Sequence, residues 1–250
     1  MIDLAIANGI ATVTMARPPV NAIDEELLAA FHAVLDRLEA DGSVQIMVLR
    51  SARKVFCAGA NIARIGEMFA EADGPEAMVE FVRGFHTLFN RIERLPLVTL
   101  AVIQGAAMGG GLEMALACDL RLASETALLG LPEAKIGMIP AAGGTQRLTR
   151  LCGAGLASRI ILGAEAITGA EAARYGLVQW AASAATLEAT LAEITERIAG
   201  LSRASLVAAK DCIAAQRDPA IDGFARELEK PLTLMRDADS QARIQAFLTR

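Results

Sequence analysis

Residues 104–113 read QGAAMGGGLE, so three consecutive glycines stand between two different patterns. Before them, residues 97–103 form an apolar run rich in Val, Leu and Ile, which predicts a buried β-strand. After them, residues 112–117 read as the start of a helix. Three glycines in a row are costly in chain entropy, which indicates that the backbone here takes φ > 0 or approaches another group closely.

A helix that begins at these glycines would point free backbone N–H groups and a partial positive charge outward. Glu113 adds a carboxylate to its first turn. Main-chain donors beside a carboxylate suit chemistry at a carbonyl group. The alternative is that the glycines only permit tight packing of strand against helix, and that Glu113 is a solvated acid. On this stretch alone, both interpretations stay open.

Composition sets broad limits on the fold and on the partners. The 250 residues are 54% hydrophobic and 21% charged, which fits one domain with a smaller appendage or two domains. The net charge is −5 and no stretch is rich in Lys and Arg, which argues against nucleic acid as a partner. Residues 95–112 carry no charge, but they contain Pro96, Gln104 and four glycines, which favours a buried strand and turn over a membrane span.

Several chemistries lack the residues that they need. The chain has only two histidines, His32 and His86, both in amphipathic helical patterns, which leaves no material for a histidine metal cage or a Ser-His-Asp triad. The four cysteines are scattered without a Cys-x-x-Cys pair, and the first residues show no secretory signal. These features predict a cytoplasmic protein without a metal site; if it is an enzyme, it works with carboxylates and backbone amides.

Two patterns in the first quarter of the chain are informative. Residues 2–7 and 10–15 read as strands joined by Asn8-Gly9, a strong hairpin signal. Residues 54–62, KVFCAGANI, place small residues where a strand gives way to a helix that Asn61 can cap. This second stretch either presents bare backbone N–H groups to a ligand or is ordinary strand–helix packing.

The later part of the chain carries a second carboxylate and then becomes helical. Residues 131–135, LPEAK, read as a loop that carries Glu133, and residues 167–172 read as a capped helix. Beyond residue 180 no further strand is evident. We therefore predict an α/β core over residues 1–180, with the active site, and a helical oligomerisation region over residues 181–250.

Together these stretches resemble the enoyl-CoA hydratase/isomerase family, also called the crotonase family. The resemblance spans nearly the whole chain and rests on four segments in the family's order and spacing, residues 17–22, 56–62, 104–119 and 131–148, with a looser match over 239–247. It implies a crotonase-like spiral of ββα units with a C-terminal helical trimerisation region. It also implies a homo-oligomer, a trimer or a dimer of trimers, and an acyl-CoA thioester substrate, so that coenzyme A is part of the substrate and not a separate cofactor.

The resemblance assigns roles to individual residues. The backbone N–H groups of Ala60 and Gly110 correspond to the family's oxyanion hole, Glu113 to the base that activates water, and Glu133 to the acid that protonates Cα. The positions that correspond to CoA binding are Ala22, Ala60, Asn61, Ile62 and Gly110. The chain departs from many relatives at Ala63, where they have Lys, which leaves Arg17, Lys54 and Arg64 as candidate phosphate contacts. Without the resemblance, Glu133 would read as an exposed loop acid.

The pair of glutamates predicts an enoyl-CoA hydratase, which adds water syn to a 2-enoyl-CoA thioester and gives 3-hydroxyacyl-CoA. One alternative is another reaction on the same scaffold, either enoyl-CoA isomerisation or hydration of a specialised enoyl-CoA. A less favoured alternative is a non-catalytic acyl-CoA-binding subunit, for which two intact glutamates would be unnecessary.

Overall fold

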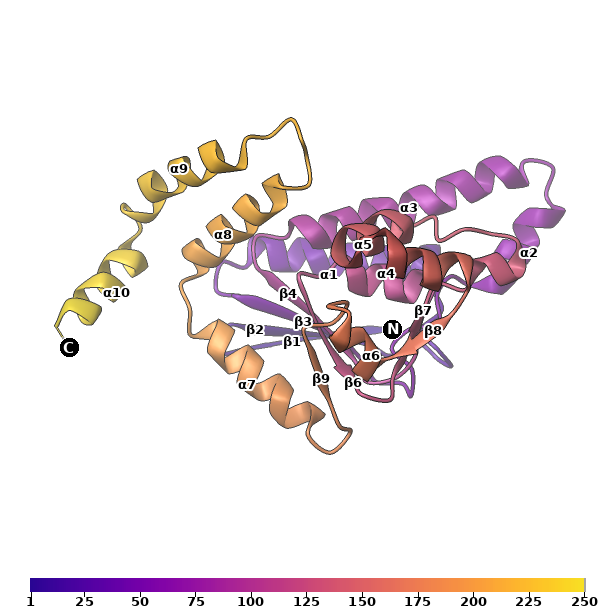
Figure 1. The fold of residues 1–250 in the computed structure, drawn as a ribbon, viewed down its shortest axis with the longest axis horizontal. Helices are drawn as coiled ribbons and strands as arrows, with labels where there is room; N and C mark the ends of the chain where they lie inside the picture. Colours follow the sequence, from indigo (N-terminus) through magenta and orange to yellow (C-terminus); the bar gives the residue numbers. More distant parts are fainter. Residues whose placement is uncertain (250) are drawn as a thin grey trace.

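A six-stranded sheet forms the centre of the computed structural model, which describes residues 1–249 (Figure 1). In order across the sheet, the strands are β1 (Ile2–Ala7), β2 (Ile10–Met15), β3 (Ile46–Ser51), β4 (Val98–Ile103), β6 (Leu120–Ser124) and β9 (Trp180–Ala182). Strands β1 and β2 are antiparallel and the other neighbours are parallel. Asn8 and Gly9 both have positive φ, as a tight hairpin turn requires. The predicted hairpin and the predicted strand before the glycines are therefore confirmed.

A second, smaller sheet lies against the glycine turn. Its strands, in order, are β5 (Ala107–Met108), β7 (Leu128–Gly130) and β8 (Ala166–Thr168). The sequence does not predict β5 or β8, because two or three residues are too few to show an alternating pattern. The predicted helix over residues 167–172 starts slightly later, as α6 (Gly169–Arg174), and Thr168 caps it through a capping box with Glu171.

Helices cover both faces of the six-stranded sheet. The larger core packs one face against a group of helices that comprises α1 (Glu25–Ala40), α2 (Ile62–Ala70), α3 (Gly74–Arg94), α4 (Gly110–Leu116) and α5 (Gly144–Leu162). On the other face, Val48 and Leu100 pack against Leu191 of α7 (Leu187–Ala199). The parallel strands are therefore buried on both sides, which explains their continuous apolar sequence.

The last two helices leave the body of the protein. After α7, the chain forms α8 (Arg203–Ala215), α9 (Gly223–Leu234) and α10 (Ala238–Leu248), and Figure 1 shows α9 and α10 as an arm that extends away from the sheets. Neither α9 nor α10 has a buried residue. The helical pattern predicted for this region is confirmed, whereas a domain boundary at residue 180 stays a prediction. Among residues 1–249, no helix combines the length and the apolar character needed to cross a membrane.

Candidate active site

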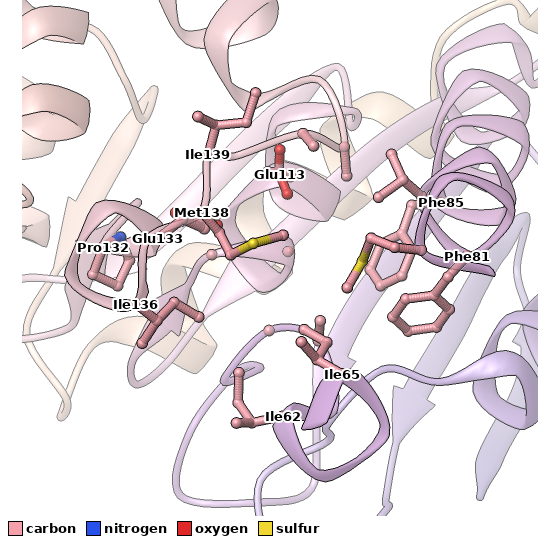
Figure 2. A pocket seen from close by; sticks show the side chains of 18 of the residues that line it. Ile62, Ile65, Phe81, Phe85, Glu113, Pro132, Glu133, Ile136, Met138 and Ile139 are labelled. Atoms are coloured by element: carbon pink, nitrogen blue, oxygen red, sulfur yellow. The ribbon is translucent and has the colours of Figure 1, made fainter. Parts of the chain in front are cut away.

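A cavity of about 320 Å³ lies between α3, the start of α4 and the segment over residues 132–142. Most of the side chains that line it are apolar, including Ile62, Ile65, Phe81, Phe85, Met138 and Ile139. Figure 2 shows Phe81 and Phe85 of α3 across the cavity from Glu133. The ionisable lining residues are Glu113, Glu133 and Lys135. An apolar cavity with a few polar groups is the usual form of a small-molecule site.

The glycine turn brings one backbone donor to this cavity. Gly109 has φ +52°, and a Cβ there would lie 2.8 Å from Oε1 of Glu133, so only glycine fits. Gly110 is the first residue of α4, where a backbone N–H has no partner within the helix. No other described residue accepts a hydrogen bond from it. The N–H of Gly110 is therefore available to a ligand.

The segment before α2 brings a second donor beside the first. Ile23 bonds to both neighbours of Ala60, because its N–H donates to Gly59 O at 2.9 Å and its carbonyl accepts from Asn61 N at 2.8 Å. The N–H of Ala60 itself has no acceptor among the described residues. A Cβ placed on Gly110 would lie 3.5 Å from the nitrogen of Ala60, so the two N–H groups are close neighbours. The two small-residue segments, 50 positions apart in sequence, form one site.

Glu113 is buried, with 3% of its surface exposed, so the interpretation of this residue as a solvated acid is wrong. Its Oε1 accepts a hydrogen bond of 2.7 Å from the N–H of Gly144, at the start of α5. Burial raises the pKa of Glu113 to about 7, and the negative charge of Glu133 acts in the same direction. The N–H groups of Gly144 and Ala142 and the cationic Arg147 oppose this rise.

Glu133 lies in a 3₁₀ turn (Glu133–Ile136) and not in the irregular loop that the sequence predicts. The turn is tied to the following segment by a 3.0 Å bond from Met138 N to Glu133 O. The side chain is half-buried, and its Oε2 is buried without a hydrogen-bond partner among the described residues. Burial raises the pKa of this carboxyl as well. A buried carboxyl oxygen without a partner is costly, and a bound water or substrate would satisfy it.

The remaining positions matched to CoA binding lie in the same segment before α2 or beside it. Asn61 caps α2 as predicted, because its Oδ1 accepts from Ala63 N and Arg64 N. Ile62 lines the cavity, whereas Ala22 does not, although Ala22 immediately precedes the Ile23 bridge to Ala60. Two candidate phosphate contacts are engaged in ion pairs, Arg17 with Asp24 and Arg64 with three glutamates.

Comparison with known families matches the model described as "Enoyl-CoA hydratase/isomerase" over residues 5–250. The chain belongs to this family. Its fold is the crotonase fold, since it aligns with a crystal structure of an enoyl-CoA hydratase from Bacillus anthracis at a TM-score of 0.92. That alignment covers 99% of this chain and 96% of the other, at 31% identity. The predicted fold class is therefore confirmed.

Curated relatives in this family carry hydratase names. A protein of Arabidopsis thaliana named "Probable enoyl-CoA hydratase 2, mitochondrial" is 39% identical over 193 residues, which cover 76% of this chain and 62% of the relative. A protein of Mus musculus named "Methylglutaconyl-CoA hydratase, mitochondrial" is 41% identical over 159 residues, which cover 63% of this chain and 49% of the relative. The chain thus matches less than two thirds of the length of each of these two relatives.

Three features of this crotonase site are not evident in the sequence. The first is the N–H of Gly144, which reaches a carboxylate 31 positions earlier in the chain. The second is the pair of aromatic side chains, Phe81 and Phe85, which the helical pattern marks only as core residues. The third is the contact of His86, whose Nε2 lies 2.7 Å from the carbonyl oxygen of Ala141. Ala141 lines the cavity, so His86 contacts the site from outside it. The glycine pair at 143–144 is the local signal for the first feature.

Proposed function

We propose that this chain is an enoyl-CoA hydratase, which adds water to a 2-enoyl-CoA thioester and gives 3-hydroxyacyl-CoA. One observation carries the proposal: two carboxylates, Glu113 and Glu133, meet two backbone N–H groups, those of Ala60 and Gly110, at one mostly apolar cavity, and neither N–H has an acceptor within residues 1–249. Hydration of a conjugated thioester needs this set of groups, because it moves two protons and builds negative charge on the thioester oxygen.

The two N–H groups stabilise that charge. The thioester oxygen accepts from Ala60 and Gly110, and both bonds strengthen as the double bond is attacked. The dipole of α4 points its positive end at the same oxygen. Removal of one such donor costs about 2.7–4 kcal/mol of transition-state stabilisation in measured cases, because the site is dry and the donors are fixed in advance.

The carboxylates handle the protons. Ionised Glu113 takes a proton from water as the hydroxyl oxygen bonds to Cβ, and Glu133 in its acid form gives a proton to Cα. In net terms the water supplies both the hydroxyl group on Cβ and the proton on Cα, because the proton on Glu113 passes back to Glu133 before the next cycle. A pKa of about 7 suits Glu113 as a base at neutral pH, and a raised pKa suits Glu133 as an acid.

We extend the proposal to the coenzyme part of the substrate and to the assembly of the protein. We assign the CoA portion to the backbone around Ala22, Asn61 and Ile62, next to the oxyanion donors. We also propose a homo-oligomer, a trimer or a dimer of trimers, that covers the apolar stripes of the C-terminal arm. On α9, Phe224, Leu228 and Leu232 recur every fourth residue and are exposed, which is the pattern of a helix face that packs against another surface.

The deciding experiment follows the loss of the conjugated thioester absorbance of crotonyl-CoA with the purified protein. The substitutions Glu113→Gln and Glu133→Gln should each lower the hydration rate about 10²–10⁴-fold. Both variants should still bind acyl-CoA, because each substitution removes one acid–base group without changing the shape of the cavity. Glu125→Gln, at an exposed position, is the matched control.

Other outcomes would favour the competing functions. Turnover of a 3-enoyl-CoA with no hydration of crotonyl-CoA would favour isomerisation, and turnover only of a branched or carboxylated enoyl-CoA would favour a specialised hydratase. Tight binding of a panel of enoyl-CoAs with no turnover of any would favour a non-catalytic subunit. Wild-type rates in both glutamine variants would contradict the mechanism.

A further inference from the structure

The segment that holds Glu113 in place is itself held by a buried arginine. Arg147 lies one turn into α5, is 8% exposed, and donates from Nη1 to the carbonyl of Ala142 at 3.1 Å. Two residues later in the chain, the N–H of Gly144 makes the 2.7 Å bond to Oε1 of Glu113. The guanidinium packs over Gly143, which has φ +103° and where a Cβ would collide with it. The position of the guanidinium and the path of the backbone that reaches Glu113 therefore depend on each other.

Helix α3 anchors this arrangement from the opposite side. Its residues His86, Asn90 and Glu93 are spaced by four and three positions and so lie on one face of the helix. Nη2 of Arg147 donates to Asn90 Oδ1 at 2.7 Å and to Glu93 Oε2 at 3.2 Å, while His86 contacts the carbonyl of Ala141. The Nε of Arg147 has no acceptor among the described residues, so its two Nη atoms alone fix its place.

The ion pair continues to the C-terminal helices. Oε1 of Glu93 also pairs with Nη1 of Arg217 at 2.5 Å, just after the end of α8. Glu93 is therefore shared between two arginines, and Arg147 is the one that is bonded to the segment before α5. A buried charge with this many directed bonds is expensive unless all of them are kept, which favours a defined position over a mobile one.

We propose that Arg147 is a positioning residue for Glu113: fixed by Asn90 and Glu93, it holds residues 142–144 so that the Gly144 N–H orients the carboxylate. The charged and titratable groups around Glu113 are Glu133 from the 3₁₀ turn, Arg147 from α5, and His86 from α3 through Ala141. Of these, Arg147 is the cation that acts directly on the carboxylate. The predicted effect of Arg147 on the reaction rate rests on the proposed function. Its predicted effect on the Glu113 carboxylate does not, because that effect can be measured without any substrate.

The test compares variants that act on Glu113 in opposite directions. Arg147→Gln removes the cation and should raise the pKa of Glu113, whereas Glu93→Gln leaves Arg147 less neutralised and should lower it. The protonated carboxyl band of Glu113 in infrared spectra, assigned by its loss in Glu113→Gln, gives this pKa without any substrate. Arg147→Lys keeps the charge but not the paired donors, so it should restore the pKa and not the rate. If crotonyl-CoA is turned over, Arg147→Gln should lower kcat/KM about 10²-fold, with the acid limb of the pH profile moved upward.

The controls separate this role from a loss of folding. Arg150→Gln, on an exposed part of the same helix, should match the wild type in both measurements. Because Glu93 keeps Arg217 as a partner, Arg147→Gln does not leave an unpaired buried carboxylate. An unchanged infrared pKa in folded Arg147→Gln, or shifts of the same sign in Arg147→Gln and Glu93→Gln, would overturn the proposal. Opposite shifts in a protein that turns over no enoyl-CoA would support the positioning role while the proposed function fails.

Discussion

Helix α4 is buried along its whole length, whereas helix α10 has no buried residue. Every residue from Gly110 to Leu116 in α4 is buried, including the carboxylate of Glu113. In α10, the three large apolar residues Ile244, Phe247 and Leu248 are all exposed on one side. The first helix is covered by its own chain, follows a glycine with positive φ, Gly109, and carries a costly buried acid. The second helix carries no such features, but it displays apolar area that a monomer in water rarely leaves open.

This difference separates two kinds of sensitivity. Around α4, single atoms matter, because backbone, carboxylate and cavity are in direct contact and cannot move apart without loss of the site. Around α10, a single substitution should hardly change the stability of the protomer. It should have a measurable effect only if this helix packs against another copy of the chain. The four changes below test this contrast, in order of decreasing expected effect.

Removal of the Gly110 N–H should have the largest effect. Gly110→Pro deletes the donor at the first helical position, where proline is tolerated, so the helix should persist. We expect about a 10²–10³-fold loss of kcat on crotonyl-CoA. The control is Gly110→Ala, which keeps the N–H and adds only a Cβ, 3.1 Å from the ring of Phe85. Equal rates in the two variants, with intact circular dichroism, would argue against the oxyanion role of Gly110.

Replacement of the buried acid should stabilise the protein while it lowers the activity. The pKa of Glu113 rises from its ordinary 4.5 to about 7 in the folded state. The folded state therefore holds this proton more tightly than the unfolded state, so the wild type loses stability as pH rises from 4.5 to 7. At about 1.4 kcal/mol per pH unit, Glu113→Gln should gain about 3 kcal/mol over the wild type across this window, and no more above it.

Urea unfolding at pH 5, 6, 7 and 8 measures this gain. The exposed Glu125→Gln variant should follow the wild type at every pH. A difference between Glu113→Gln and the wild type that does not change with pH would mean that Glu113 titrates alike in the folded and unfolded states, contrary to the burial seen here.

A single methyl group at Gly111 should destabilise α4. A Cβ there would overlap the carbonyl of Cys57, which is backbone and cannot turn aside. Although alanine is the better helix former, Gly111→Ala should cost about 1–3 kcal/mol. The matched control is Gly66→Ala in α2, where a Cβ meets nothing within 4 Å and helix propensity should add about 0.5–1 kcal/mol. Thermal unfolding of both variants distinguishes them, and a stabilised Gly111→Ala would show that this part of α4 can relax.

The same contrast explains what the sequence could predict. Gly109-Gly110-Gly111 and Glu113 are detectable because glycines and an acid at a strand-to-helix junction form a local pattern. The approach of the Ala60 N–H to this turn is predicted only through the family resemblance, and the placement of the Gly144 N–H and of Arg147 is not predicted at all. Each of these groups comes from a distant part of the chain, and its position depends on how the two sheets and α3 are placed. The apolar stripes of α9 and α10 are also visible in the sequence, but periodicity cannot tell a buried stripe from an exposed one.

A charge on the C-terminal arm should leave the protomer almost unchanged. Phe247 of α10 is 75% exposed, so Phe247→Asp should alter the free energy of unfolding of the protomer by no more than about 0.5 kcal/mol. If copies of the chain pack on this face, the buried charge should instead lower the mass of the assembly, as measured by light scattering. Ala242→Asp, on the side of α10 away from this stripe, adds the same charge at an exposed position and should keep the wild-type mass. An unchanged mass in Phe247→Asp would mean that this stripe is not an interface between copies, and the contrast between α4 and α10 would then need another cause.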